Sequence, residues 1–216
     1  MRPRIKVCCI SSQEEARMAI REGASALGLV GRMPSGPGVI TDDLIAAIAG
    51  STPPPIGTFL LTSETKPADI ISHHKKTFTN TIQIVDTLAD GKYAEIRTAL
   101  PTIKLVQVIH VMDESSIEEA LELAAEVDAL LLDSGNPKLA IKELGGTGRV
   151  HNWKLSRTIV EQSPVPVFLA GGLNPSNVKQ AIDEVQPYGL DLCSGVRTNG
   201  RLDPAKLEAF FKNASY

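Results

Sequence analysis

The sequence predicts an α/β protein of the (β/α)8 TIM-barrel class, on three observations. Short apolar runs of strand length alternate eight times with amphipathic helical patterns in a chain of 216 residues. Turn residues separate each run from the next helix, as the crossovers between parallel strands require. No linker or low-complexity segment divides the chain, so we expect one domain over residues 1–216.

The elements follow in order along the chain. Strands are expected at Ile5–Cys9, Ala26–Val30, Ile56–Leu61, Thr81–Val85, Leu105–Val111, Ala129–Asp133, Val165–Ala170 and Gly189–Cys193. Helices are expected at Gln13–Glu22, Asp42–Ile48, Ala68–Thr77, Lys92–Ala99, Ile117–Ala125, Lys154–Gln162, Asn177–Glu184 and Pro204–Phe211. The competing arrangement is a doubly wound open sheet, whose phosphate-binding Gly-x-Gly-x-x-Gly after the first strand is absent here.

Three helix starts carry capping signals. Ser12 precedes the first helix with Glu15 three residues later, which is the pattern of a capping box. Ser115, with Glu118 three residues later, is expected to cap the fifth helix in the same way. Asp203 precedes a proline at the first position of the last helix, where proline fits best.

Composition and charge exclude several classes of partner. The formal net charge is −3, and no long block of one sign occurs, which argues against nucleic acid and against a membrane surface. No apolar stretch approaches the roughly 18 residues that a membrane span needs, and the start of the sequence has no signal-peptide core. We therefore expect a cytoplasmic protein.

The three cysteines are expected to be reduced thiols. An odd number without metal-type spacing or a secretion signal indicates a reducing compartment and no metal site. On strand alternation Cys8 and Cys9 face opposite sides, so only one can face the barrel interior. The histidines His73, His74 and His151 lack ligand spacing and are expected at the surface.

In a TIM barrel the active site lies at the carboxyl ends of the strands, and phosphate often binds after strands seven and eight. Gly171 and Gly172 follow the expected seventh strand, and Ser194 and Gly195 follow the eighth. Backbone N–H groups can approach an oxyanion closely where no Cβ intervenes, so this placement favours phosphate binding over a role in turns alone.

Residue types and their order together resemble the phosphoribosylanthranilate isomerase family of tryptophan biosynthesis. The resemblance covers nearly the whole chain and rests on five segments, which are Lys6–Ser11, Leu132–Asp133, Gly145–Trp153, Leu169–Val178 and Asp191–Val196. It implies a TIM barrel that converts a phosphoribosyl aminoaldose into an aminoketose by an Amadori rearrangement, without metal or cofactor. It assigns the general base to Cys8 and the general acid to Asp133.

The resemblance also implies substrate contacts. The loop Ser134–Gly148, with Gly146 and Thr147 at its small-residue centre, is expected to fold over the ligand and exclude water. Asp191 is expected near the amine of the substrate, where a structural role remains an alternative. Gly171, Gly172, Ser194 and Gly195 are expected to bind the phosphate.

Two departures from the family pattern concern the anthranilate. The family carries an arginine after strand two that helps to hold the carboxylate, whereas this chain reads Ser35-Gly36-Pro37-Gly38. After strand four the family histidine is replaced by Val85, and Asp86 adds a negative charge. We therefore expect weak carboxylate binding unless Arg32, in the same loop as Ser35, reaches inward as a substitute cation.

The expected function is isomerisation of a small phosphorylated sugar amine with anthranilate as the leading aglycone, by a monomer or homodimer. One alternative is a paralogous isomerase with a different aglycone. Another is a non-catalytic barrel that binds a phosphosugar for regulation.

Overall fold

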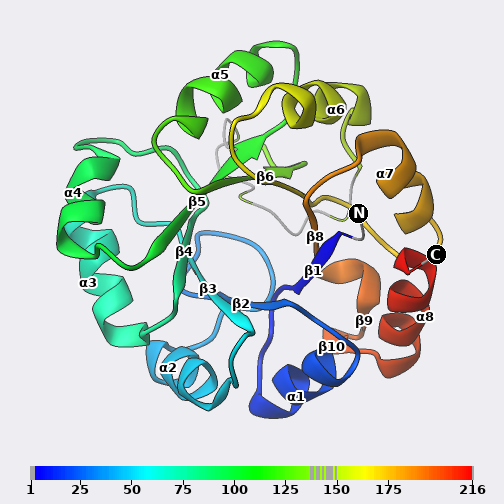
Figure 1. Cartoon of the computed structure of the whole chain (residues 1–216). Helices are drawn as coiled ribbons and strands as arrows, with labels where there is room; N and C mark the ends of the chain where they lie inside the picture. Colours follow the sequence, from blue (N-terminus) through cyan, green and yellow to red (C-terminus); the bar gives the residue numbers. More distant parts are fainter. Residues whose placement is uncertain are drawn as a thin grey trace.

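The computed structural model describes residues 3–136, 139, 142, 144, 148 and 150–215. Within them, eight parallel strands close into a barrel in the order β1 to β8, and the helices surround it (Figure 1). The strands are β1 (Arg4–Val7), β2 (Ala26–Val30), β3 (Gly57–Thr62), β4 (Thr81–Ile84), β5 (Lys104–His110), β6 (Ala129–Asp133), β7 (Val167–Leu169) and β8 (Gly189–Leu192). The predicted fold class is confirmed.

The helices that follow the strands lie close to their predicted positions. They are α1 (Gln13–Arg21), α2 (Asp42–Ser51), α3 (Pro67–Thr77), α4 (Tyr93–Ala99), α5 (Ser115–Ala124), α6 (Trp153–Gln162), α7 (Val178–Val185) and α8 (Pro204–Ala214). A short 3-10 helix, η1 (Ser194–Val196), and a hairpin of β9 (Arg197–Thr198) with β10 (Arg201–Leu202) connect β8 to α8.

The barrel closes where β1 pairs with both β2 and β8. Lys6 lies opposite Ala26 on one side and opposite Asp191 on the other. The first and last strands of the sheet are thereby neighbours. Residues of β1, near the start of the chain, consequently meet residues of β8, near its end, at the same end of the barrel.

Two apolar clusters hold the structure together. The larger one lies between strands and helices and includes Val7, Leu27 and Ile109. The smaller one fills the barrel interior with side chains such as Phe59, Val106 and Phe168. Both faces of the sheet are covered, which is why the strands read as continuous apolar runs rather than alternating ones.

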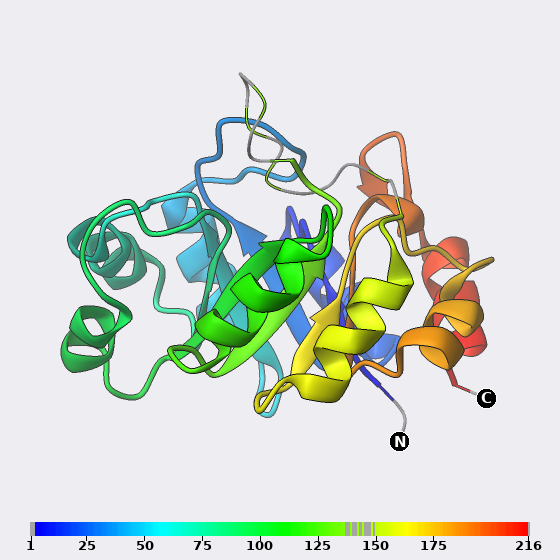
Figure 2. The same ribbon diagram turned by 90° about the horizontal axis from the view of Figure 1, so that it is seen from above.

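The loops after β2 and β8 rise from the end of the barrel opposite the N-terminus (Figure 2). This is the carboxyl end of the strands, where TIM-barrel active sites lie. In the described part of the chain, no helix is both long enough and apolar enough to span a membrane.

Two of the three predicted caps are confirmed. The Ser12 side chain accepts a hydrogen bond from the Glu15 N–H, and Asp203 accepts from Ala205 and Lys206. The prediction for Ser115 is wrong, because α5 begins at that residue and Glu114 precedes it. Ser115 instead donates its hydroxyl to Asp113.

Candidate active site

The carboxyl ends of the strands surround a pocket of about 700 Å³, measured with its opening to solvent. Its walls come from loops and strand ends far apart in the sequence. The described lining residues are Cys8, Cys9, Val30, Met33, Ser35, Gly36, Pro37, Leu61, Gln83, Val85, Asp133, Leu144, Gly148, Ala170, Gly171, Gly172, Leu173, Asp191, Leu192, Cys193 and Ser194.

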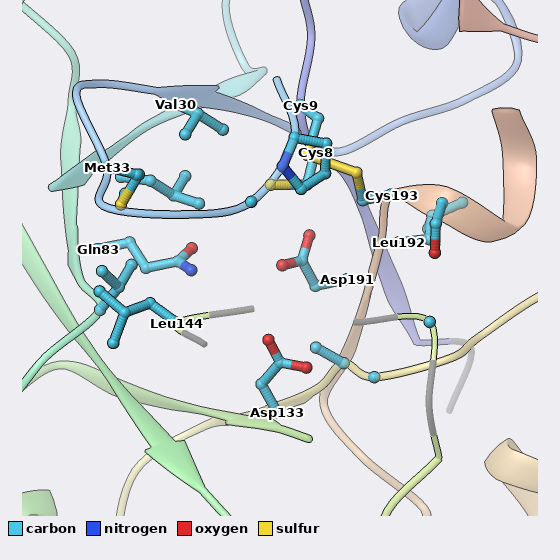
Figure 3. A pocket seen from close by; sticks show the side chains of 18 of the residues that line it. Cys8, Cys9, Val30, Met33, Gln83, Asp133, Leu144, Asp191, Leu192 and Cys193 are labelled. Atoms are coloured by element: carbon cyan, nitrogen blue, oxygen red, sulfur yellow. A yellow bond between two sulfur atoms is a disulfide. The ribbon is translucent and has the colours of Figure 1, made fainter. Parts of the chain in front are cut away.

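The pocket has two distinct ends, which we name the glycine end and the apolar end. The glycine end consists of Gly171, Gly172 and Ser194, and the apolar end of Val30, Met33, Val85 and Leu144. In Figure 3, Asp133 and Asp191 lie between the apolar side chains on one side and Cys193 on the other. The charged groups therefore occupy the middle of the pocket.

Strand β1 directs Lys6 toward the centre of the barrel, and Cys8 follows it on the same side. Val7, between them, packs outward against the helices. Gly28 on β2 makes room for both, because a Cβ there would lie 2.7 Å from the Cys8 sulfur and 2.9 Å from the Lys6 nitrogen. Cys8 therefore lines the pocket.

Lys6 was not singled out from the sequence, yet its ammonium group lies beside the reactive groups of the pocket. It is fully buried and forms an ion pair of 2.9 Å with Asp191. Burial lowers the pKa of Lys6, but Asp191 and Cys8 raise it more, so that its pKa lies above the usual value. Lys6 therefore stays charged and neutralises Asp191.

The Cys8 thiol is buried in the same cluster. Burial raises its pKa to about 11, the Lys6 ammonium acts in the opposite direction, and the Asp191 carboxylate adds to the rise. Without a bound ligand the thiol is thus mostly protonated at neutral pH. Lys6 and a backbone hydrogen bond from Cys9 both favour the thiolate and lower the pKa of Cys8 against the effect of burial.

Asp133 ends β6 and is 7 % exposed. Burial raises the pKa of its carboxyl group, opposed by a hydrogen bond of 2.7 Å from the Ser134 N–H and by the nearby His110. The Asp191 carboxylate raises it further. A carboxyl group that holds its proton in this way is suited to act as a general acid.

The glycine end exposes backbone to the pocket. Gly171 and Gly172 have φ values of +82° and +64°, which only glycine adopts readily. Neither of them donates its N–H to a backbone acceptor within the described residues. The Gly172 carbonyl, in contrast, accepts from the side-chain amides of Asn174 and Asn177, which fixes the loop.

Gly195 has a different reason to be glycine. A Cβ at this position would lie 2.0 Å from the Leu173 carbonyl oxygen, so close packing between the loops after β7 and β8 excludes any side chain. Gly195 does not line the pocket, although Ser194 beside it does. Gly195 is therefore required for the packing of these two loops, whether or not its backbone also binds a ligand.

The expectation of three reduced thiols is wrong for two of them. Cys9 and Cys193 form a disulfide with a Cα–Cα distance of 5.9 Å. A sequence separation of 184 residues concealed this pair, which exists because β1 and β8 are neighbours. Cys8 is the remaining free thiol.

The expectation that Cys8 and Cys9 face opposite sides is also wrong, since both line the pocket. Strand β1 ends at Val7, and Cys9 has a φ of +60° in the left-handed region. Strand alternation does not extend through a residue in that conformation. The turn brings the Cys9 side chain back to the pocket.

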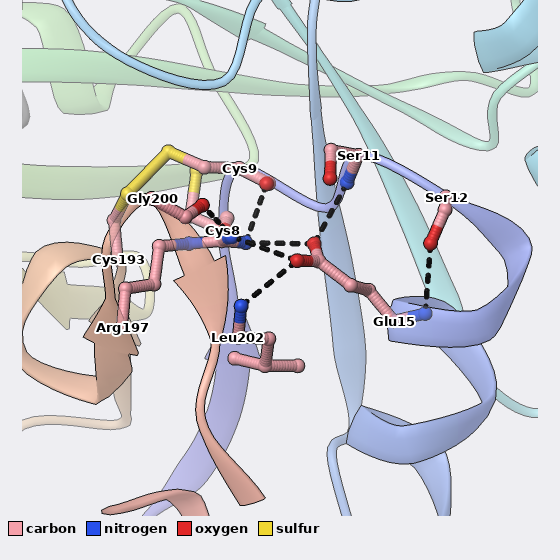
Figure 4. A network of polar contacts seen from close by, with 9 residues as sticks. All are labelled: Cys8, Cys9, Ser11, Ser12, Glu15, Cys193, Arg197, Gly200 and Leu202. Carbon is pink, nitrogen blue, oxygen red and sulfur yellow. Dashed lines mark hydrogen bonds and ion pairs between the residues drawn. A yellow bond between two sulfur atoms is a disulfide. The ribbon is translucent and has the colours of Figure 1, made fainter.

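Arg197 and Glu15 hold the loop that carries Cys8 (Figure 4). The guanidinium forms two hydrogen bonds of 3.0 Å to the Glu15 carboxylate and also donates to the carbonyl oxygens of Cys8 and Cys9. Burial raises the pKa of Glu15, but hydrogen bonds from Arg197, Leu202 and Ser11 lower it below the usual value. Glu15 thus braces the loop instead of closing the predicted capping box with Ser12.

The apolar end lacks an arginine, as the sequence indicated. The Arg32 side chain is exposed and does not line the pocket; its carbonyl accepts the Ser63 hydroxyl. Asp86, which was expected to repel an anion, is paired with the Lys142 ammonium. Its negative charge is therefore balanced.

Gln83 adds a polar group that the sequence did not single out. It is 3 % exposed and lines the pocket, and its Oε1 atom has no hydrogen-bond partner among the described residues. An unpaired buried carbonyl oxygen is costly unless a ligand donor satisfies it.

The predicted surface position of the histidines is wrong. His73 contacts Thr62 and Asp42, and His74 is buried with its Nε2 on the Thr79 carbonyl. His151 contacts Ser156, and burial lowers its pKa to about 4. Pairs of consecutive residues on a helix do not reveal which of them faces the sheet.

Two predicted site residues, Gly146 and Thr147, lie outside the described residues. The other positions predicted to bind or react, except Arg32 and Gly195, line the pocket together. In the described part of the chain, no three His, Cys, Asp or Glu side chains form a cluster that could hold a metal ion.

Comparison with known proteins places this geometry in a family. Residues 5–213 match the family model described as N-(5'-phosphoribosyl)anthranilate (PRA) isomerase. N-(5'-phosphoribosyl)anthranilate isomerase 2 of Methanosarcina mazei is 37% identical over 213 residues, which cover 98% of this chain and 93% of the relative. The isomerase of Methanocella arvoryzae is 30% identical, with coverage of 94% and 93%.

Solved structures agree. Phosphoribosyl anthranilate isomerase from Thermotoga maritima superposes with a TM-score of 0.81 at 28% identity over 98% of both chains. An isomerase in complex with reduced 1-(o-carboxyphenylamino)-1-deoxyribulose 5-phosphate gives 0.79 at 26% identity, again over 98% of both chains. With a closed barrel whose pocket carries the thiol and carboxyl groups of the family segments, this chain belongs to the phosphoribosylanthranilate isomerase family, the aldose–ketose isomerases of tryptophan biosynthesis.

Proposed function

We propose that this protein isomerises N-(5'-phosphoribosyl)anthranilate with Cys8 as general base and Asp133 as general acid. The observation that carries the proposal is the convergence of a buried thiol from β1 and a buried carboxyl group from β6 on one pocket. The two groups come from strands on different sides of the barrel. A ligand between them can therefore receive a proton from one and lose a proton to the other.

The chemistry starts with two proton transfers, and tautomerisation of the resulting enolamine completes it. Asp133 gives a proton to the ring oxygen of the ribose, the bond from C1 to that oxygen breaks, and the nitrogen lone pair forms a C1–N double bond. The Cys8 thiolate then removes the proton from C2, the electrons of that C–H bond form a C1–C2 double bond, and the π electrons of the C1–N double bond return to nitrogen. The resulting enolamine loses its hydroxyl proton and gains one at C1, which yields the aminoketose.

The productive enzyme form contains a Cys8 thiolate and a protonated Asp133. Burial raises the pKa of both groups, to about 11 for the thiol, so the Cys8 thiolate is the scarce component of the productive form at neutral pH. A small fraction of enzyme is thus active at any time. Lys6 enlarges this fraction because its positive charge favours the thiolate.

The two ends of the pocket suit the two ends of the substrate. The N–H groups of Gly171 and Gly172 lie where TIM barrels bind phosphate, and the apolar side chains at the other end suit an aromatic ring. The ligand of the solved relative carries a carboxyphenyl amine and a 5-phosphate. We place the phosphate of the present substrate at the glycine end and its ring at the apolar end.

Steady-state kinetics with phosphoribosylanthranilate tests this assignment. Cys8→Ala and Asp133→Asn should each lower kcat by at least about 100-fold, the usual contribution of a general acid or base. Asp128→Asn is the matched control, since Asp128 lies just before the opposite end of the same strand and accepts the Leu105 N–H outside the pocket. It should lose stability but keep kcat.

A variant of Cys8 or Asp133 that keeps near-wild-type kcat would remove that residue from the mechanism. A well-folded wild-type protein without turnover of phosphoribosylanthranilate would favour the paralogous isomerase or the non-catalytic barrel. Growth of a tryptophan auxotroph that lacks this isomerase gives the same distinction in cells.

A further inference from the structure

The proposed function requires the apolar end to hold the carboxylate of the aglycone. An anthranilate ring carries a carboxylate, and a carboxylate that leaves water needs a charged or hydrogen-bonding partner. The walls nearest the ring are Met33, Val85 and Leu144, none of which is a cation. Arg32 is exposed on the outside of its loop.

Lys142 lies at the rim of this end. Its ammonium nitrogen is 2.5 Å from Oδ2 of Asp86, the residue that follows the wall residue Val85. Its carbonyl oxygen accepts the hydroxyl of Ser35, also at 2.5 Å, and Ser35 lines the pocket. Leu144, two residues further along, is itself a wall of the pocket.

These contacts fix Lys142 from two sides. Ser35 belongs to the loop after β2 and Asp86 to the loop after β4, so the lysine is anchored where the two loops approach each other. Asp86 is held in turn, because its Oδ1 atom accepts the Thr87 N–H at 2.9 Å. The carboxylate thus acts as a buried, fixed support for the ammonium group.

The other cations near the pocket are engaged. Lys6 is fully buried and paired with Asp191. Arg197 is 7 % exposed and bound to Glu15. The Lys142 side chain, in contrast, is 46 % exposed, and of the three donors of its ammonium group Asp86 takes one among the contacts that the described residues make. Lys142 therefore retains donors for a ligand.

We propose that Lys142 binds the carboxylate of the aglycone and that Asp86 is the positioning residue that holds it at the rim. This inference rests on the proposed function. It assigns to the loop after β6 the recognition that a cation in the loop after β2 would otherwise supply. The Asp86 carboxylate repels the ligand carboxylate, but it also holds the Lys142 ammonium group in place. The pair therefore binds an aromatic acid more tightly than a neutral aromatic ring, with moderate affinity.

Binding of two ligands tests the inference directly. The first is reduced 1-(o-carboxyphenylamino)-1-deoxyribulose 5-phosphate, and the second is the same compound without its carboxyl group. Calorimetry should show that the wild type prefers the first by about 10- to 100-fold, as expected for one charge-assisted contact. In Lys142→Ala this preference should fall to less than about threefold, because affinity for the second ligand changes little.

Further variants separate charge from structure. Lys142→Arg should restore most of the preference, while Lys142→Gln should not. Asp86→Asn should reduce the preference only in part, because the lysine remains but loses its support. Lys66→Ala, at an exposed lysine before α3 that lies outside the pocket lining, is the matched control and should keep the full preference.

A preference that survives in Lys142→Ala, or that disappears in Arg32→Ala instead, would overturn the inference. The absence of any preference in the wild type would overturn it as well. Turnover of phosphoribosylanthranilate by the wild type is measured alongside. If turnover is absent while both ligands bind, the proposed function fails, and the ligand preference still decides the role of Lys142.

Discussion

The glycine end and the apolar end of the pocket are built by different means. At the glycine end, Gly171 and Gly172 line the pocket, and the side-chain amides of Asn174 and Asn177 donate to the Gly172 carbonyl and hold the loop. At the apolar end, the polar contacts at the rim come from the side chains of Ser35 and Asp86 with Lys142. One end depends on backbone conformation and the other on side-chain identity.

This difference explains why the two ends do not follow the family pattern equally closely. A backbone site tolerates no change in its glycines but is insensitive to many neighbouring side chains. A side-chain site can move its cation from one loop to another, provided that the charge reaches the same place. The glycine end accordingly keeps the family segments, whereas the apolar end departs from them.

The largest expected effect comes from removal of the phosphate from the ligand. A product analogue without its 5-phosphate should bind about 100- to 1000-fold more weakly, since several charge-assisted hydrogen bonds from backbone N–H groups are lost together. Inhibition constants measure this loss, and inorganic phosphate should compete with the substrate. A loss smaller than that caused by removal of the carboxyl group would reverse the ranking of the two ends.

The pH profile reports the groups between the two ends. The active form needs a Cys8 thiolate and a protonated Asp133, and the thiolate is the minor form of Cys8 at neutral pH because its pKa is about 11. Below the raised pKa of Asp133, kcat/KM should therefore fall about tenfold per pH unit. Above it the profile should be flat until the Cys8 pKa of about 11, beyond which kcat/KM falls again.

Asp133→Asn should remove most of the activity and replace the flat region of the profile by a steady rise toward the Cys8 pKa of about 11. A profile of the wild type that instead rises steadily from pH 6 to pH 9 would mean that thiol ionisation alone limits the rate. That result would take the acid role from Asp133.

A smaller effect is expected from a methyl group at the glycine end. Gly171→Ala should weaken inorganic phosphate about tenfold, because alanine resists a φ of +82° and its Cβ would lie 3.0 Å from the Ser134 hydroxyl. Gly200→Ala is the matched control, with a similar φ of +77° but open space around the new Cβ. It should lose comparable stability and keep its phosphate affinity, as measured by thermal unfolding and competition.

The smallest effect on binding is expected from reduction of the disulfide. Denatured, unreduced protein should show one reactive thiol, and reduced protein three. Reduction should lower the free energy of unfolding by about 2–4 kcal/mol. Reduction should weaken the binding of inorganic phosphate only a fewfold, because Arg197 still holds the carbonyl oxygens of Cys8 and Cys9.

Reduction of the disulfide should not change the preference for the ligand with a carboxyl group over the ligand without one, since Lys142 and Asp86 lie on other loops. Three reactive thiols in the unreduced protein would contradict the disulfide. An equal loss of phosphate and carboxylate recognition would contradict the independence of the two ends.

The sequence by itself determined the alternation of strands and helices, because buried strands and amphipathic helices have different periods of apolar residues. It also indicated where each strand ends to within two residues, and hence that Cys8, Asp133 and Gly171 share one pocket, whereas Asp191 was indicated by the family resemblance. Local signals sufficed for two of the caps, Ser12 and Asp203, because their partners lie within three residues.

Contacts between distant segments could be identified only from the tertiary structure. The disulfide of Cys9 with Cys193, the ion pair of Lys6 with Asp191 and the pair of Lys142 with Asp86 each join residues from different strands or loops. No periodicity within one element encodes such a pair, since it depends on barrel closure and on the path of each loop. For the same reason, the sequence indicated that a cation was missing at the apolar end, but only the fold placed Lys142 there.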